Sequence, residues 1–260
     1  MRLLITSTFV LALFTFWGQD SKVNVMPLSS ICQSPFHLSV NGNYTSIHYT
    51  VNGTIPTKKD KKIDSTFIIN KTTALLIKAF FKDKKRDTLI ARSYIFDTIS
   101  KLPVISISIP EEDLWDSKKG IYTRGSNAFY SDSTGHWENC NFQKKWEKKV
   151  QINYIDSNQS EVINQACGLR IFGESTRRQP DKSLKIVARK KYGENRFKYS
   201  FFNQKPEIKE YKQLVIRTSG NDYNSTRFKD ILNAYLARNL GIDYMAYQQV
   251  RMYVNGEYWG

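Results

Sequence analysis

The chain has 260 residues, with 39 Lys or Arg against 24 Asp or Glu and a formal net charge of +15. This length is sufficient for one or two domains, and the positive surplus favours acidic partners. Cys32, Cys140 and Cys167 have a spacing that suits no zinc motif, and the three histidines lie far apart, so we expect neither a metal centre nor a catalytic Cys–His pair.

Residues 1–19 have the pattern of a signal peptide. The chain begins with Met1-Arg2, continues as an apolar run from Leu3 to Trp17, and turns polar at Gly18. The run is short and interrupted by Ser and Thr, which favours cleavage over a membrane anchor. No second hydrophobic span follows, so we expect a secreted or cell-envelope protein without a transmembrane segment after cleavage. Export also argues against nucleic acid as a partner.

Residues 34–97 are predicted to form a small β-sandwich. Apolar residues alternate with polar ones from Ile47 to Val51, and Asn52-Gly53 follows as a hairpin signal. Further short strands are expected at 67–69, 75–79 and 90–96. Short strands at this spacing are typical of a sandwich.

Residues 102–260 are predicted to form a larger α+β domain after a linker at Lys101-Leu102-Pro103. Apolar residues from Phe228 to Leu240 recur at helical spacing, with Ser225 or Thr226 as the cap and Gly241 at the end. The predicted strands are 104–109, 150–155, 167–172, 183–189, 213–218 and 248–254, the last followed by a hairpin turn.

The segment from Gly168 to Ile186 is the strongest candidate site. A predicted strand enters a glycine turn that carries hydroxyl groups and two arginines, and a second strand leaves with lysines. Glycine lets a phosphate approach the backbone, and guanidinium groups hold oxygens in pairs. Taken alone this pattern is weak, because basic hairpins with solvated lysines are common.

Two family resemblances extend this interpretation. The stretch Ile47 to Thr57, together with Thr72 to Ala79, resembles the immunoglobulin-like module at the C-terminus of chitobiases and β-hexosaminidases. That resemblance implies a spacer or a surface-binding role and supplies no catalytic residues. Tyr49 could stack on a sugar, although a packing role on the strand is the favoured interpretation.

The second resemblance covers residues 102–260. Leu102 to Ser106, Trp146-Glu147-Lys148, Gly168 to Gly173, Pro180 to Leu184 and Tyr253 to Gly260 resemble landmarks of the CotH family, kinase-like proteins named for spore coat protein H. The resemblance implies the N-terminal part of an atypical protein-kinase-like domain that uses ATP and Mg²⁺ to phosphorylate exported or coat proteins.

The resemblance also implies roles for particular residues. Gly173, Ser175 and Arg177 would line the turn over the phosphates, and Lys182 or Lys185 would hold a phosphate. Asp230 is the nearest candidate for the acidic partner of that lysine, although an acidic residue in the first turn of a helix commonly serves the helix dipole. Catalytic residues are not assigned.

A kinase also needs acids or amides for the substrate hydroxyl and for Mg²⁺, and no such pair is visible in the sequence. We therefore expect a fragment of a longer protein that cannot transfer phosphate by itself. The alternatives are a coat-associated or cell-surface scaffold that binds acidic polymer, and a glycan-binding accessory protein that recognises a cell-surface polysaccharide.

Overall fold

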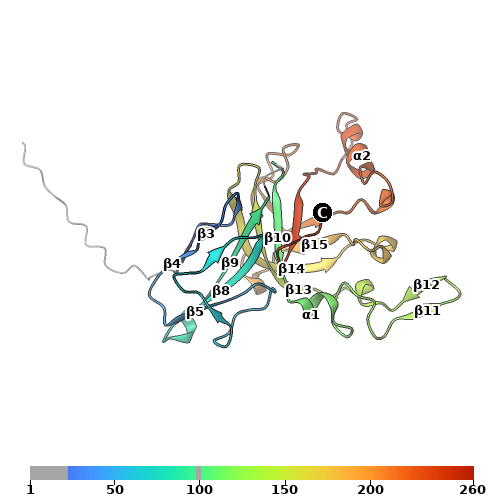
Figure 1. Ribbon diagram of the computed structural model, residues 1–260. Coiled ribbons are helices and arrows are strands. Elements are labelled where there is room, and N and C mark those ends of the chain that lie inside the picture. The colour runs from blue at the N-terminus through green and yellow to red at the C-terminus, as the bar shows by residue number, and fades with distance from the viewer. Residues whose placement is uncertain (1–22, 98–100) are drawn as a thin grey trace, which may run out of the picture.

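The computed structural model describes residues 23–97 and 101–260 (Figure 1). The predicted signal peptide lies outside the described residues. The described part of the chain is mostly β-structure with two short α-helices, α1 (Glu111–Trp115) and α2 (Lys229–Ala237). Within these ranges no helix has the length and apolar character needed to cross a membrane.

The N-terminal part, residues 23–97, forms a β-module. Its five-stranded sheet has the order β2-β9-β8-β5-β6, and the pairs β1-β4 and β3-β7 lie beside it. The strands are β1 (Asn24–Met26), β2 (Ser30–Cys32), β3 (Phe36–His37), β4 (Ser39–Asn41), β5 (Ser46–Thr50), β6 (Lys61–Lys62), β7 (Ile68–Ile69), β8 (Thr73–Phe80) and β9 (Thr88–Phe96). The ring of Tyr49 packs on Phe67 with centroids 4.6 Å apart, beside the module's core.

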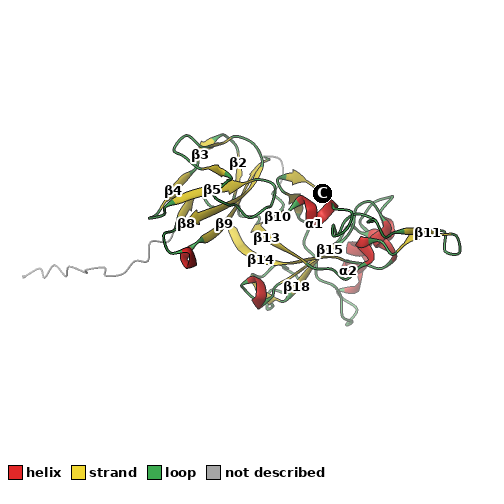
Figure 2. Cartoon of the chain, turned by 90° about the horizontal axis from the view of Figure 1, so that it is seen from below, coloured by secondary structure: helices red, strands yellow, loops and turns green. Residues whose placement is uncertain are grey.

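The remainder of the chain is built on a seven-stranded sheet with the order β18-β15-β14-β13-β10-β19-β20. Its strands are β10 (Val104–Ser108), β13 (Lys148–Ile155), β14 (Glu161–Ile171), β15 (Leu184–Val187), β18 (Gln213–Ile216), β19 (Arg251–Val254) and β20 (Glu257–Tyr258). All neighbours are antiparallel except β10 and β19. Two small hairpins, β11 (Phe129–Ser131) with β12 (His136–Glu138) and β16 (Phe197–Lys198) with β17 (Glu210–Tyr211), lie outside this sheet. The first of them projects at the end of the molecule opposite the β-module (Figure 1 and Figure 2).

One face of the seven-stranded sheet carries the main hydrophobic core. Cys167, Leu169 and Ile171 of β14 point into this core together with Leu184 and Ile186 of β15. Because successive side chains of a strand alternate between faces, Gly168 and Arg170 lie on the opposite face. We call this opposite face the outer face.

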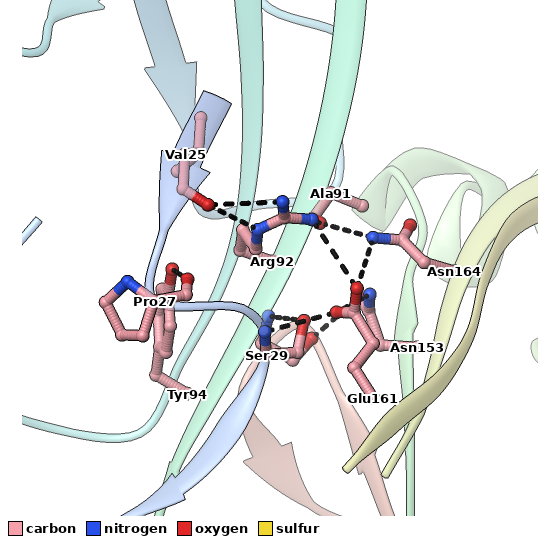
Figure 3. Close-up of polar contacts among 10 residues, drawn as sticks. Val25, Pro27, Ser29, Ala91, Arg92, Tyr94, Asn153, Glu161 and Asn164 are labelled. Carbon is pink, nitrogen blue, oxygen red and sulfur yellow. Dashed lines mark hydrogen bonds and ion pairs between the residues drawn. The ribbon is translucent and has the colours of Figure 1, made fainter. Parts of the chain in front are cut away.

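The β-module packs against part of the outer face through buried polar groups (Figure 3). The Ser93 hydroxyl of β9 lies 2.8 Å from Ser106 Oγ of β10 and 3.0 Å from Asn153 Oδ1 of β13. Asn164 of β14 donates from Nδ2 to the carbonyl of Ala91 at 2.9 Å. Because buried polar groups are costly unless they are paired, this network fixes one orientation of the two parts.

An ion pair lies at the centre of the same contact (Figure 3). The guanidinium of Arg92, a residue only 8% exposed, donates to the carbonyls of Val25 and Ala91 and lies 3.6 Å from Glu161 Oε1. The Glu161 carboxylate also accepts hydrogen bonds from Ser29 N, Asn153 Nδ2 and Asn164 Nδ2. The β-module is therefore part of one continuous structure with the larger sheet.

The helix predicted from 228 to 240 is shorter and differently capped in the structure. It spans Lys229–Ala237, and Thr226 Oγ1 accepts only a long hydrogen bond, of 3.4 Å, from the N–H of the N-cap residue Phe228. The Asp222 carboxylate instead accepts from the backbone N–H groups of Phe228 and Lys229, at 2.7 and 3.0 Å. A carboxylate placed there pairs the free donors at the start of the helix and interacts favourably with its dipole.

Candidate anion-binding site

The glycine turn after β14 is built around Thr176. Gly173 has φ +103°, and a Cβ at this position would lie 2.3 Å from Thr176 Oγ1. A Cβ on Gly220 would lie 2.5 Å from Thr176 Cγ2. Both glycines are therefore needed to let the 3-10 turn η3 (Ser175–Arg178) fold back over the end of the strand.

Arg177 connects this turn to a neighbouring one. Its Nε donates to the carbonyl of Gly173, and its Nη1 donates to the carbonyl of Gln143 at 3.0 Å, in the 3-10 turn η2 (Asn141–Gln143). Both acceptors are neutral carbonyls, so neither contact balances the positive charge of the guanidinium at the junction of the two turns.

Lys182 lies on the core side of the sheet and is only 6% exposed. Its Nζ lies 4.4 Å from the centre of the Phe142 ring and 5.2 Å from that of Tyr122. The ammonium donates to the carbonyl of Gln179 at 2.6 Å. Burial lowers the pKa of Lys182 to about 8, because the charged form loses water.

Further cations lie around the neighbouring Cys140, and one of them, Arg124, also lowers the pKa of Lys182. Burial raises the pKa of the Cys140 thiol, and the positive charges of four neighbours oppose that rise: Arg124, Arg178, Lys182 and Lys144. Together with Arg177 these residues form what we call the basic cluster. Within the described residues no member of the basic cluster has a carboxylate within 4 Å.

Neighbouring arginines outside the cluster are neutralised. Arg217 donates from Nε to Asp230 Oδ2 at 2.8 Å, and Arg227 pairs with Asp181 at 3.0 Å. These two arginines therefore differ from the members of the basic cluster, which have no such partner among the described residues.

The structure brings some of the predicted site residues together and separates others. Gly173, Ser175 and Arg177 share the turn, and Lys182 lies in the basic cluster with Arg177. Lys185 lies on the outer face, with its Nζ 4.8 Å from the centre of the Phe172 ring. Asp230 lies at the start of α2 and is occupied by Arg217 rather than by a lysine.

Three members of the basic cluster were not among the predicted site residues. Arg178 was visible in the sequence as the second arginine of the turn. Arg124 and Lys144 come from a stretch whose sequence shows only turns, and no pattern connects them to Lys182. Lys144 ends η2, and Arg124 is joined to η2 because its carbonyl accepts a hydrogen bond from Asn141 N at 2.7 Å. The packing of η2 against η3 then brings both residues near the turn.

Comparison with known proteins finds one family match. Residues 169–260 match the family described as CotH kinase protein. Over this stretch the chain is CotH-like. The CotH-like stretch begins within β14 and contains the glycine turn, Lys182 and α2, whereas Arg124 and Lys144 precede it. No curated protein and no solved structure matches the chain.

Proposed function

We propose that the chain is the nucleotide-binding portion of an exported CotH-like protein kinase, with ATP as the ligand of the basic cluster. The observation that carries the proposal is the gathering of five cations without a carboxylate within 4 Å among the described residues: Arg124, Lys144, Arg177, Arg178 and Lys182. Cations held close together repel one another, and a partly buried environment strengthens that repulsion. A bound polyphosphate removes this cost and gains charge-assisted hydrogen bonds.

The details of the cluster suit a phosphate chain. Arg177 is fixed by two carbonyls, and Lys182 is held by Gln179 and two aromatic rings, so little side-chain entropy is lost on binding. The exposed hydroxyl of Ser175 and the turn backbone add hydrogen-bond donors. This arrangement supports the roles proposed for Gly173, Ser175, Arg177 and Lys182, and it favours Lys182 over Lys185 as the phosphate ligand.

The acceptor of the phosphoryl group would be an exported or coat protein, in keeping with the CotH family, which is named for spore coat protein H. Mg²⁺ would accompany the ATP, held largely by its phosphates together with one or two carboxylates or amides. Within the described residues no group of three or more His, Cys, Asp or Glu side chains could hold a metal ion, and no Mg²⁺ ligand is assigned. The proposed site therefore consists of the basic cluster and the glycine turn alone.

Calorimetric titration of the full chain with ATP tests the proposal. Replacing Lys182 with Met together with Arg178→Gln should weaken ATP binding at least tenfold, about 1.4 kcal/mol. Lys61→Met with Lys62→Gln, which removes two exposed charges on the β-module, is the matched control and should leave the affinity unchanged. Unchanged ATP affinity in a folded Lys182→Met, Arg178→Gln protein would favour the scaffold alternative, in which the positive surplus binds acidic polymer.

A further inference from the structure

A second group of cations lies on the outer face, around one buried carboxylate. The Glu147 side chain is only 7% exposed and contacts Arg170, Arg189 and Lys191 at 2.8, 2.9 and 3.1 Å. Tyr192 donates its hydroxyl to the same carboxylate at 3.0 Å. Although burial acts to raise the pKa of Glu147, the hydrogen bonds from these groups lower it to about 2.

The backbone is shaped to hold this carboxylate in place. A Cβ on Gly168 would lie 2.6 Å from Glu147 Cδ, so glycine is required for the carboxylate to lie over β14. The ammonium, the two guanidinium groups and the phenol then converge on it from two sides, from β14 and from the segment that follows β15.

Each arginine uses only part of its hydrogen-bonding capacity on Glu147. Arg170 and Arg189 both contact the carboxylate through Nε, at 2.8 and 3.0 Å from Oε2. Their Nη1 and Nη2 groups have no hydrogen-bond partner among the described residues, and the two side chains are 35% and 36% exposed. The Nη1 and Nη2 groups of both arginines are thus available to a ligand from solvent, while the contacts of Nε with Glu147 hold the two guanidinium groups in place.

The charge of this face is also unbalanced. One carboxylate is shared by three cations, and Lys185 lies directly opposite Arg170 in the pairing of β14 with β15. Like charges at directly opposite positions destabilise a sheet. An anion bound between them would reverse that repulsion.

We propose that Arg170, Arg189 and Lys191, positioned by Glu147, form a second binding site whose ligand is a phosphomonoester group. A phosphomonoester offers three oxygens and nearly two negative charges, which match two paired guanidinium forks and an ammonium. The site lies on the opposite face of the sheet from Lys182, so it is separate from the proposed nucleotide site and does not depend on it.

Two sources share this chemistry, a phosphorylated side chain of a protein and free phosphate. The full chain is titrated with inorganic phosphate, with a Gly-Ser peptide that carries one phosphoserine, and with the unphosphorylated peptide. We expect the phosphoserine peptide to bind and the unphosphorylated peptide not to bind. Tighter binding of the phosphopeptide than of phosphate identifies protein as the source, and the reverse order identifies free phosphate.

The variants are chosen to keep Glu147 paired. Arg170→Lys with Arg189→Lys preserves charge but removes the forked donors, and should weaken phosphopeptide binding at least tenfold. Lys191→Met, at an exposed position, should weaken it several-fold. Lys198→Met, which removes an exposed lysine paired with Glu194, and Lys182→Met should leave it unchanged. Phosphopeptide binding that survives Arg170→Lys with Arg189→Lys, or that is lost in Lys182→Met, would overturn the proposal.

Discussion

Lys182 and Lys185 lie on opposite faces of the same sheet, although only two residues separate them in the sequence. Lys182 contacts Phe142, a member of the main core cluster, whereas Lys185 alternates with the core residues Leu184 and Ile186 and points to the outer face. The two ammonium groups cannot hold the same phosphate.

This separation gives the first prediction. Lys182→Met should weaken ATP binding at least tenfold, and Lys185→Met should change it less than twofold, because only Lys182 belongs to the basic cluster. Both variants remove one positive charge, so each controls for the other. Fluorescent ATP displacement or calorimetry measures the difference, and equal losses from the two variants would contradict the assignment.

The second prediction concerns the effect of Lys182 on the pH dependence of the free energy of unfolding. The pKa of Lys182 is lowered to about 8 in the folded chain, and an unfolded lysine has a higher pKa, so the folded state binds fewer protons between these values. The free energy of unfolding contributed by this group should therefore rise as pH increases from about 8 towards 10. The rise should be absent in Lys182→Met, which urea unfolding at several pH values would show.

The same ammonium should also take up a proton when ATP binds. A bound phosphate favours the charged form, so at pH 8 about half a proton should be absorbed per ATP. Calorimetry in two buffers of different ionisation enthalpy measures this uptake. If Lys182→Met shows the same uptake as the natural chain, the proton goes elsewhere and the prediction fails.

The third prediction concerns acid stability. The pKa of Glu147 in the folded chain is about 2, below that of an unfolded glutamate. The contribution of Glu147 to the free energy of unfolding is therefore fully present above about pH 4.5 and is lost as pH falls towards 2. Glu147→Gln should lower the free energy of unfolding by about 3 kcal/mol at pH 7. The difference from the natural chain should shrink steadily in urea unfolding between pH 5 and pH 3, and a difference independent of pH would refute it.

The fourth prediction tests whether the β-module and the larger sheet unfold together. Every tryptophan of the described residues lies in the larger part of the chain, at positions 115, 137, 146 and 259. Arg92→Met leaves the Glu161 carboxylate without its cation and should destabilise the fold by about 3 kcal/mol. Although Arg92 belongs to the β-module, tryptophan fluorescence should report this loss in full, in one cooperative urea transition.

A control separates this coupling from local damage. Lys78→Met, in the same sheet, removes a partly exposed ion pair with Asp87 and should shift the transition by less than 1 kcal/mol. A tryptophan transition unchanged by Arg92→Met would mean that the two parts unfold independently.

Several strands could be predicted because apolar and aromatic residues cluster in short segments. The predicted strand 150–155 lies within β13, and 90–96 lies within β9. The first half of β14 was missed, because Glu161 and Asn164 are polar where a buried strand is expected to be apolar. Both residues face the β-module, where buried hydrogen bonds replace apolar contact, and this cannot be inferred from local pattern.

Prediction of the candidate site from local sequence pattern was also only partly successful. Gly173, Arg177 and Lys182 could be predicted because they belong to one turn and the residues directly after it. The partners that give Lys182 its environment, such as Phe142 and Arg124, lie about 40 to 60 residues earlier, and only tertiary packing brings them close.

The pairing of β19 with β10 determines when the fold can be completed. β10 is an early strand of the large sheet, yet its parallel neighbour β19 lies almost at the end of the sequence. Tyr253 of β19 also completes the small apolar cluster formed by Ile95, Val104 and Ile155, beside the junction of the two parts. Contacts between segments so distant in sequence form late and slowly, since the intervening loop must first be closed. During synthesis, β10 therefore lacks its parallel neighbour until β19 has emerged, and that edge of β10 stays unpaired up to that point.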